Sequence, residues 1–183
     1  NIRSKIIEAG GEIHFNSRVA DLLVEDDRCT GIMLADTTIV EAEAIILAAG
    51  HSSREIYELL YQRGISIEAK SFAVGVRAEH PQVLIDSIQY NQPERGPYLP
   101  PATYSFVEQV DQRGVYSFCM CPGGIMVPAA TAPGEMVING MSPTQRNTKF
   151  ANSGMVVEIR PEDLNEFRYA GVFAGLEFQR SIE

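Results

Sequence analysis

The chain has few of the residues on which several classes of protein depend. Its 183 residues contain only 15 lysines and arginines against 24 aspartates and glutamates, which leaves a net charge of −9. A nucleic-acid surface needs clustered basic residues, and here they are few and scattered. No apolar run approaches the roughly 20 residues of a membrane-spanning helix, and no signal peptide is recognisable. We therefore expect a cytoplasmic domain without a nucleic-acid or membrane partner.

Cysteine and histidine are also scarce. Cys119 and Cys121 are two residues apart, and alternate residues on one face of an extended strand lie roughly 6.5–7 Å apart, beyond the usual disulfide span. Reduced thiols and a cytoplasmic location are the simpler expectation. The histidines His14, His51 and His80 have no recognisable ligand spacing to the cysteine pair, so we expect no metal site.

A further absence concerns nucleotides. No Gly-x-Gly-x-x-Gly follows a strand, although this element supplies the backbone amides and the helix N-terminus that hold a dinucleotide pyrophosphate. The chain begins without Met, inside an expected amphipathic helix that ends at Gly10 and Gly11, and it stops inside another expected helix, 170–183. We therefore expect an internal fragment of a longer protein.

The most informative segment that is present is an apolar run, 44–49, which stops abruptly at Gly50. The run predicts a strand buried on both faces, as in a parallel sheet, and glycine permits a tight turn after it. A helix is predicted over 53–63, with Ser52 or Ser53 as its cap and Gly64 ending it in the left-handed conformation. His51 is expected to be a capping or surface residue.

Short strands joined by tight turns precede this run. The expected strands cover 11–19, 20–25, 28–34 and 38–42, with one turn at Asp26 and Asp27 and another at Asp36 and Thr37. The alternation of apolar and polar residues predicts an antiparallel β-meander.

The order of meander, buried strand and glycine turn resembles the FAD-binding domain of flavoproteins of the glutathione reductase type. In that family a strand ends in an Ala-Thr-Gly-like turn, and here Ala48-Ala49-Gly50 occupies its place. Three further segments resemble a bacterial group of uncharacterised FAD-utilising or NAD-utilising dehydrogenases: SFAVGVRAEHPQVLIDSIQY, RGPYLPPATYSF and the stretch from GVYSFCMCPGG to NTKFANSGMVV.

The resemblance implies FAD as the cofactor of the longer protein, with NAD(P)H as a candidate electron partner. It implies that main-chain groups at Val19 hold the adenine ring and that the backbone of Ala48, Ala49 and Gly50 approaches the adenosine half. The alternatives are a plain core residue at Val19 and a purely steric need for glycine at Gly50. Without the pyrophosphate loop and the late flavin-ring segment of such proteins, the fragment alone is expected not to hold FAD tightly.

Organisation changes near residue 70. Residues 1–70 are interpreted as the remnant of a Rossmann-like FAD-binding domain, and 71–183 as a substrate (cap) domain with a mainly antiparallel sheet, within an α/β (α+β) fold. The second part predicts a strand over 72–78, a helix over 81–88 and a proline-rich loop over 93–101. Further strands are expected over 104–107, 115–120, 125–127, 136–141 and 155–158.

Cys121 is the sharpest catalytic candidate. A Cys-Pro-Gly-Gly turn presents a thiol beside backbone amides, which suits a group next to a flavin or an activated thiolate. Buried cysteine, however, usually behaves as a small hydrophobic residue, and no basic residue is adjacent in sequence to lower the pKa of this thiol. The inert alternative is therefore favoured over the catalytic one.

Two other candidates are polar residues outside the cysteine turn. Arg146, with Lys149, lies in an expected loop, 145–153, where it can fix a carboxylate or phosphate of a substrate, and a solvated loop is an equal alternative. His80, grouped with Arg77 and Glu79, is a candidate proton carrier near neutral pH, although a lone histidine before proline is more often structural.

The function expected of the longer protein is that of an FAD-dependent oxidoreductase, a dehydrogenase of a small organic substrate. The fragment would supply part of the adenosine site and the substrate side of the flavin. The alternative is a non-catalytic binding or interaction module on a flavoprotein-like scaffold. For the fragment alone we expect self-association through uncovered sheet edges and apolar surface.

Overall fold

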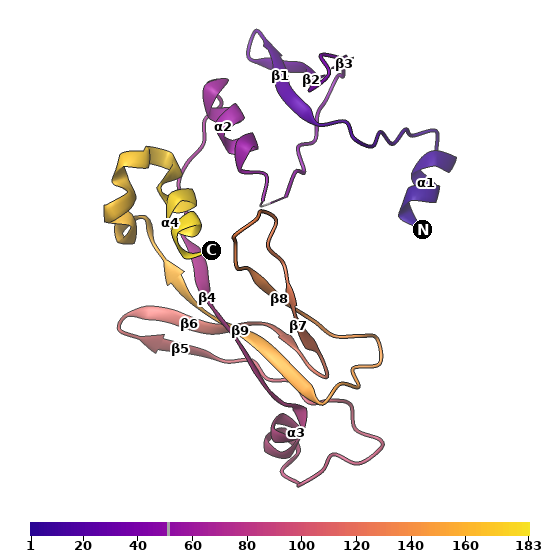
Figure 1. The fold of residues 1–183 in the computed structure, drawn as a ribbon, viewed down its shortest axis with the longest axis vertical. Coiled ribbons are helices and arrows are strands. Elements are labelled where there is room, and N and C mark those ends of the chain that lie inside the picture. The colour runs from indigo at the N-terminus through magenta and orange to yellow at the C-terminus, as the bar shows by residue number, and fades with distance from the viewer. Residues whose placement is uncertain (51) are drawn as a thin grey trace. The chain divides into compact units, whose positions relative to one another are not determined.

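The computed structural model describes residues 1–50 and 52–183, so the expected role of His51 lies outside the described residues. The chain forms two compact units, Asn1–Ile67 and Glu68–Glu183. Both combine helices with antiparallel sheets, which confirms the predicted α+β class (Figure 1).

The first unit begins with helix α1 (Ile2–Glu8), as expected, and continues into a three-stranded antiparallel sheet in the order β1-β2-β3. The strands are β1 (Val19–Glu25), β2 (Arg28–Leu34) and β3 (Ile39–Glu41). The predicted meander is therefore confirmed, although the expected strand over 11–19 exists only at Val19.

The turn between β1 and β2 follows directly from its residues. Asp26 and Asp27 both have positive φ, 49° and 60°, as a two-residue hairpin turn of type I′ requires. Asp tolerates this left-handed conformation better than most residues because its short side chain can form local hydrogen bonds. The predicted turn is confirmed.

The predicted buried strand over 44–49 is wrong. These residues have no regular secondary structure, and Ile46 is 93% exposed. A strand forms only when a neighbouring strand satisfies its backbone groups, and no strand pairs with this segment among the described residues. The predicted glycine turn and helix end after this segment are confirmed. Gly50 has a φ of +79°, and helix α2 (Arg54–Gln62) is followed by Gly64, whose φ is +71°.

The second unit is built on a four-stranded antiparallel sheet in the order β4-β9-β6-β5, with a separate hairpin, β7-β8 (Figure 1). Helix α3 follows β4, and the 3-10 helix η1 and helix α4 end the chain. The bounds are β4 (Phe72–Pro81), α3 (Gln82–Tyr90), β5 (Val107–Val110), β6 (Arg113–Cys121), β7 (Ile125–Pro128), β8 (Ile138–Met141), β9 (Phe150–Ile159), η1 (Pro161–Phe173) and α4 (Ala174–Ile182).

Two boundaries in this unit differ from prediction. Pro81 ends β4 instead of opening the helix, and it precedes α3 as the cap residue. The expected loop over 145–153 is half wrong, because β9 already begins at Phe150. The sequence pattern predicts that its polar residues face solvent, but Asn152 and Ser153 are fully buried within the sheet. There Asn152 Oδ1 accepts a hydrogen bond from Arg77, and the Ser153 hydroxyl donates one to the Gly154 carbonyl.

The second unit has an aromatic cluster at α4 and a fully buried segment at the start of β9. Phe178 of α4 packs against Phe72 and Phe167, with ring centroids 6.0 and 5.8 Å apart. Near the start of β9, Ala151 and Asn152 are 0% exposed. Among the described residues, no helix is both long and apolar enough to cross a membrane.

Candidate functional site

The first unit contains a cleft between β1 and α2. Its volume is about 300 Å³. Two elements supply most of its walls: the start of β1, and α2, which contributes both apolar and polar residues. The lining residues are Arg18, Val19, Ala20, Ala35, Glu55, Ile56, Glu58, Leu59 and Gln62.

A β-bulge lies in the part of β1 that lines this cleft. Val19 pairs with Leu34 and Asp21 pairs with Met33, so Ala20 is the extra residue without a partner in the ladder. A bulge of this kind leaves the backbone of the extra residue outside the regular hydrogen bonding of the strand pair. The cleft therefore presents main-chain groups next to Val19, one of the predicted cofactor contacts.

Charged pairs stand around α2 and β1. Arg63, just after α2, forms a two-pronged ion pair with Asp21 of β1, and Arg18 lies 3.9 Å from Glu55. The Arg63 pair joins the helix to the strand on which the cleft depends. Planar guanidinium and carboxylate groups fit each other through two parallel hydrogen bonds, which gives the contact a defined geometry.

The other predicted cofactor contacts, Ala48, Ala49 and Gly50, do not line this cleft. They form an exposed segment before α2, and the Ser53 hydroxyl donates a hydrogen bond of 2.8 Å to the Ala49 carbonyl. Ser53 is thus the residue before the helix, as expected, but its side chain binds backward to the turn and not to the helix amides. The structure does not bring Val19 and Gly50 into one site.

In the second unit, the cysteine pair sits on a bulge of β6. The register of β6 against β9 shifts between Phe118 and Cys121, and Cys119 has a φ of +49°. The strand is therefore not regularly extended there, whereas the sequence analysis treats Cys119 and Cys121 as alternate residues of an extended strand. Cys119 is exposed, Cys121 is buried, and both thiols are free.

The surroundings of Cys121 disfavour a thiolate. Burial raises the pKa of its thiol above the ordinary value, and the neighbouring Cys119 acts in the same direction, while the Arg77 guanidinium acts against them. The Sγ atom donates a long hydrogen bond of 3.4 Å to the Cys119 carbonyl. This environment suits a packed thiol better than an activated nucleophile.

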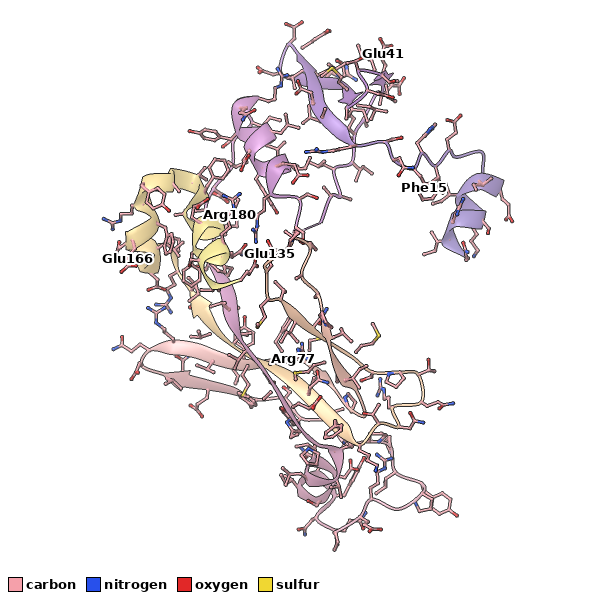
Figure 2. All side chains as sticks on the ribbon, in the orientation of Figure 1. Phe15, Glu41, Arg77, Glu135, Glu166 and Arg180 are labelled. Atoms are coloured by element: carbon pink, nitrogen blue, oxygen red, sulfur yellow. The ribbon has the colours of Figure 1, made fainter. Side chains whose placement is uncertain are left out.

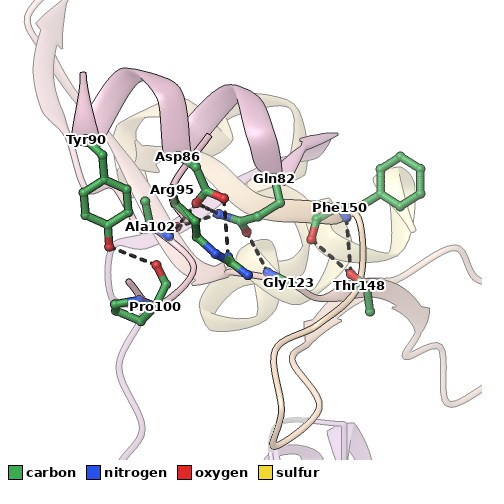
Figure 3. Close-up of polar contacts among 9 residues, drawn as sticks. All are labelled: Gln82, Asp86, Tyr90, Arg95, Pro100, Ala102, Gly123, Thr148 and Phe150. Atoms are coloured by element: carbon green, nitrogen blue, oxygen red, sulfur yellow. Dashed lines mark hydrogen bonds and ion pairs between the residues drawn. The ribbon is translucent and has the colours of Figure 1, made fainter. Parts of the chain in front are cut away.

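The amides of the Cys-Pro-Gly-Gly turn are already engaged. The Gly123 amide donates to the side-chain carbonyl of Gln82 at 2.7 Å (Figure 3), and the Gly124 amide donates to the Phe150 carbonyl at 2.9 Å. These amides are therefore not available to stabilise a developing anion beside Cys121.

Gln82 belongs to a buried polar network at the start of α3, drawn in Figure 3. Its amide nitrogen donates to the Asp86 carboxylate at 2.8 Å and to the Ala102 carbonyl at 3.0 Å. Asp86 also accepts the Ala102 amide and pairs with Arg95 at 3.3 Å. Each group is satisfied within the protein, so the network ties the helix to the proline-rich loop and the cysteine turn, and it is structural.

A second polar cluster surrounds Arg77, labelled in Figure 2, next to Gly140 of the β7-β8 hairpin. The Nη1 atom of Arg77 in β4 donates to the Cys119 carbonyl at 3.0 Å and to Oδ1 of Asn152 at 2.7 Å. Gly140 of β8 closes the cluster, since a Cβ at that position would lie 2.3 Å from Arg77 Nη1 and 2.8 Å from Cys121 Sγ. Arg77, Asn152 and Cys121 thus come together from three strands.

His80 lies elsewhere. β4 pairs with β9 without irregularity, so its side chains alternate, and His80 points to the face opposite Arg77. Its ring lies 5.5 Å from that of Tyr104, and its Nε2 atom is buried without a hydrogen-bond partner. The structure therefore separates His80 from Cys121.

Arg146 is close to the cysteine turn through its backbone. A Cβ on Gly123 would lie 1.9 Å from the Arg146 carbonyl oxygen, which explains why only glycine fits at this position, where φ is +51°. The Arg146 side chain is exposed, and Lys149 is exposed with it. Arg146 is thus available to a ligand, but it does not join the cluster around Arg77.

Asn152 is the residue that sequence reasoning placed wrongly. The loop predicted over 145–153 includes it, whereas Asn152 is fully buried and its Nδ2 atom has no hydrogen-bond partner. The apolar residues on both sides, Phe150 and Ala151 before it and Met155 to Val157 after it, are the signal that could have extended the strand through it. No group of three or more potential metal-ligating side chains gathers within residues 1–50 and 52–183.

Comparison with known proteins shows to which protein family the chain is related. An uncharacterized protein of Clostridium beijerinckii is 45% identical over 185 residues, an alignment that covers 100% of this chain and 34% of the relative. The chain thus spans about a third of the length of that relative. A sequence model of the family described as FAD-dependent protein, C-terminal domain-like, matches residues 71–183, nearly the whole of the second unit. The chain therefore belongs to this family of FAD-dependent proteins.

Proposed function

We propose that the chain is part of an FAD-dependent oxidoreductase of the glutathione reductase type, a dehydrogenase of a small organic substrate. The observation that carries the proposal is the family match over residues 71–183. In this proposal the first unit contacts the adenosine end of FAD, and the second unit forms the substrate side. Electrons would pass between the substrate, FAD and a second partner, for which a nicotinamide cofactor, NAD(P)H, is our candidate.

The cleft at Val19 fits one end of the cofactor. Its volume of about 300 Å³ stands at the lower end of the range for small-molecule sites and suits a nucleoside portion, not a whole dinucleotide. Ile56 and Leu59 supply an apolar wall for a planar ring, and the bulge at Ala20 supplies main-chain hydrogen-bonding groups. This donor set agrees with adenine recognition through the backbone.

When bound, FAD would supply the hydride acceptor that no side chain of this chain can provide. The chain's own contribution would be binding and orientation. Val19 and Ala20 would hold the adenine edge, and the Arg63–Asp21 pair would keep α2 against β1. In the second unit, Arg77 and Arg146 would present donors to the substrate, and the buried Asn152 would hold the Arg77 guanidinium in place. The three free cysteines favour a reducing compartment, and we place the protein in the cytoplasm.

The first test is the visible spectrum of the full-length protein as purified. A flavin band that bleaches when a substrate is added supports the proposal. A colourless protein that takes up no FAD on titration contradicts it and leaves a binding module on a flavoprotein-like scaffold as the better description. Titrating residues 1–183 alone with FAD shows whether the adenosine contacts suffice; we expect weak binding or none.

A variant pair locates the adenosine site. Ala35→Phe fills the cleft at the turn after β2, and we expect it to lower the FAD content of the full-length protein by about tenfold or more, because it displaces the ring from its wall. Glu41→Phe, on the exposed strand β3, is the control and should retain FAD. Equal FAD content in both variants would move the adenosine site away from this cleft.

A further inference from the structure

Among the described residues, no carboxylate forms an ion pair with Arg77. Other partly buried arginines pair with a carboxylate: Arg95 with Asp86, and Arg113 with Asp163. Within the described residues, both hydrogen bonds of Arg77 go to neutral oxygens, the Cys119 carbonyl and the Asn152 amide oxygen. The Cys121 thiol does not supply the missing charge, because burial raises its pKa. An unpaired charge at a partly buried position is costly and calls for a partner.

The free part of this guanidinium has a defined shape. Nη1 carries two hydrogens and donates to two acceptors, so it is saturated. Nη2 and Nε remain, and their N–H groups form the planar fork that binds the two oxygens of a carboxylate side by side. Asn152, which is 0% exposed, holds the other side of the guanidinium and so fixes the direction of the fork. Asn152 is therefore a positioning residue.

The sheet beside this fork is shaped by a glycine. Arg77, Gly154 and Phe118 form one row across β4, β9 and β6. A Cβ on Gly154 would lie 3.1 Å from the Phe118 carbonyl oxygen, 3.5 Å from Phe118 Cβ and 3.8 Å from Arg77 Nη2, so both side chains flank this buried glycine. Phe118 is 59% exposed, so its ring is available to a ligand on this face of the sheet.

We propose that Arg77, Gly154 and Phe118 form a binding site for a small organic carboxylate, with Arg77 gripping the carboxylate and Phe118 contacting the apolar body of the ligand. Gly154 is the floor of this site. The assignment of this ligand as the oxidoreductase substrate rests on the proposed function above, whereas the binding itself does not. The site lies on the sheet face of Cys121, and it replaces Arg146 as the principal anion anchor.

The test uses the full-length protein with benzoate as the probe, and benzamide as a neutral molecule of the same shape. Binding is measured by equilibrium dialysis. We expect saturable binding of benzoate and at least about tenfold weaker binding of benzamide, since only the carboxylate pairs with the fork. Arg77→Lys keeps the charge and loses the fork, so it should weaken the binding of benzoate about tenfold. Arg168→Lys, a matched change at an exposed arginine of η1 in the same unit, should leave benzoate binding unchanged.

Phe118→Ala is the second variant, and its exposed position makes it safe for folding. It should weaken benzoate by about three- to tenfold through loss of the aromatic contact. The proposal is overturned if benzoate does not saturate, if benzamide binds equally well, or if Phe118→Ala and a folded Arg77→Lys both bind like the wild type. If Arg77→Lys fails to fold, as judged by circular dichroism, Phe118→Ala alone decides.

The outcome is separable from that of the flavin test. A colourless protein that binds benzoate through Arg77 contradicts the oxidoreductase and keeps the carboxylate site. A protein that contains flavin but does not bind benzoate supports the proposed oxidoreductase function and contradicts the proposed carboxylate site.

Discussion

The side-chain carbonyl of Gln82 accepts a hydrogen bond of 2.7 Å from the backbone amide of Gly123. The two residues are 41 positions apart, and the contact joins the first turn of α3 to the cysteine turn after β6. It also decides what that turn can do, because an amide that serves the protein scaffold does not serve a reacting group. Cys121 and the glycines that follow it are therefore held as part of the frame around the Arg77 cluster.

Replacing Gln82 should destabilise the second unit strongly. Gln82→Leu removes one acceptor and two donated hydrogen bonds at a site that is 4% exposed, and it leaves the Asp86 carboxylate and the Gly123 amide short of partners. We expect the free energy of unfolding to fall by about 2–4 kcal/mol, because unsatisfied buried polar groups carry their full desolvation cost. Urea unfolding of the chain followed by circular dichroism measures this. Gln89→Leu, at an exposed position of the same helix, should change it little; equal losses in both variants would deny the network its role.

Gly140 should not tolerate a side chain. In Gly140→Ala the new methyl group would meet Arg77 Nη1 and the Asn152 amide oxygen, each 2.3 Å away. Overpacking of this kind costs about 1–3 kcal/mol, and we expect a loss of unfolding free energy in that range. Gly114→Ala in β6 is the control, because the nearest atom to its new methyl group is 3.9 Å away. A stable Gly140→Ala protein would mean that the hairpin does not lie against the cluster as described.

The ion pair of Arg113 with Asp163 should make stability depend on acid pH. The Arg113 guanidinium holds the pKa of the Asp163 carboxyl well below its ordinary value, and the Arg160 amide adds to the effect. Since the folded-state pKa is depressed, the stabilisation is complete above the unfolded pKa of about 3.9 and is lost as pH falls toward the folded value. Urea unfolding between pH 2 and 7 should show a constant gap between wild type and Asp163→Asn above about pH 5, narrowing below pH 4. Glu162→Gln, a neighbouring exposed carboxylate, should show no such gap.

Alkylation should distinguish the two cysteines of the bulge. Cys119 is exposed and should react with iodoacetamide in the native protein, whereas the buried Cys121 thiol, with its raised pKa, should react slowly at pH 7 and rapidly after unfolding. Mass spectrometry of the labelled peptides gives both rates. Faster labelling of Cys121 than of Cys119 would instead indicate an activated thiolate and would revive the catalytic hypothesis. In that case Cys121→Ser should lower turnover of the full-length protein, and Cys119→Ser should not.

Local patterns in the sequence predicted the features that depend on local physics. The turn at Asp26 and Asp27, the helix end at Gly64 and the meander of the first unit follow from residue types that accept positive φ and from alternating polarity. The prediction over 44–49 failed because an apolar run specifies burial only when partner strands exist to pair with it. The prediction for Asn152 was wrong because a polar side chain can be buried when another side chain binds it, as Arg77 binds the Asn152 amide oxygen.

By itself, the sequence determined the α+β class, the positions of the tight turns and the absence of a dinucleotide phosphate loop. These features follow from patterns within short segments, namely apolar periodicity, turn residues and the spacing of glycines. The tertiary structure decided the site. Arg77, Phe118 and Gly154 come from three strands, and their meeting depends on the register of β9 between β4 and β6. A shift of one residue in that register would turn Gly154 to the opposite face, and no local pattern specifies which residues of distant strands lie side by side.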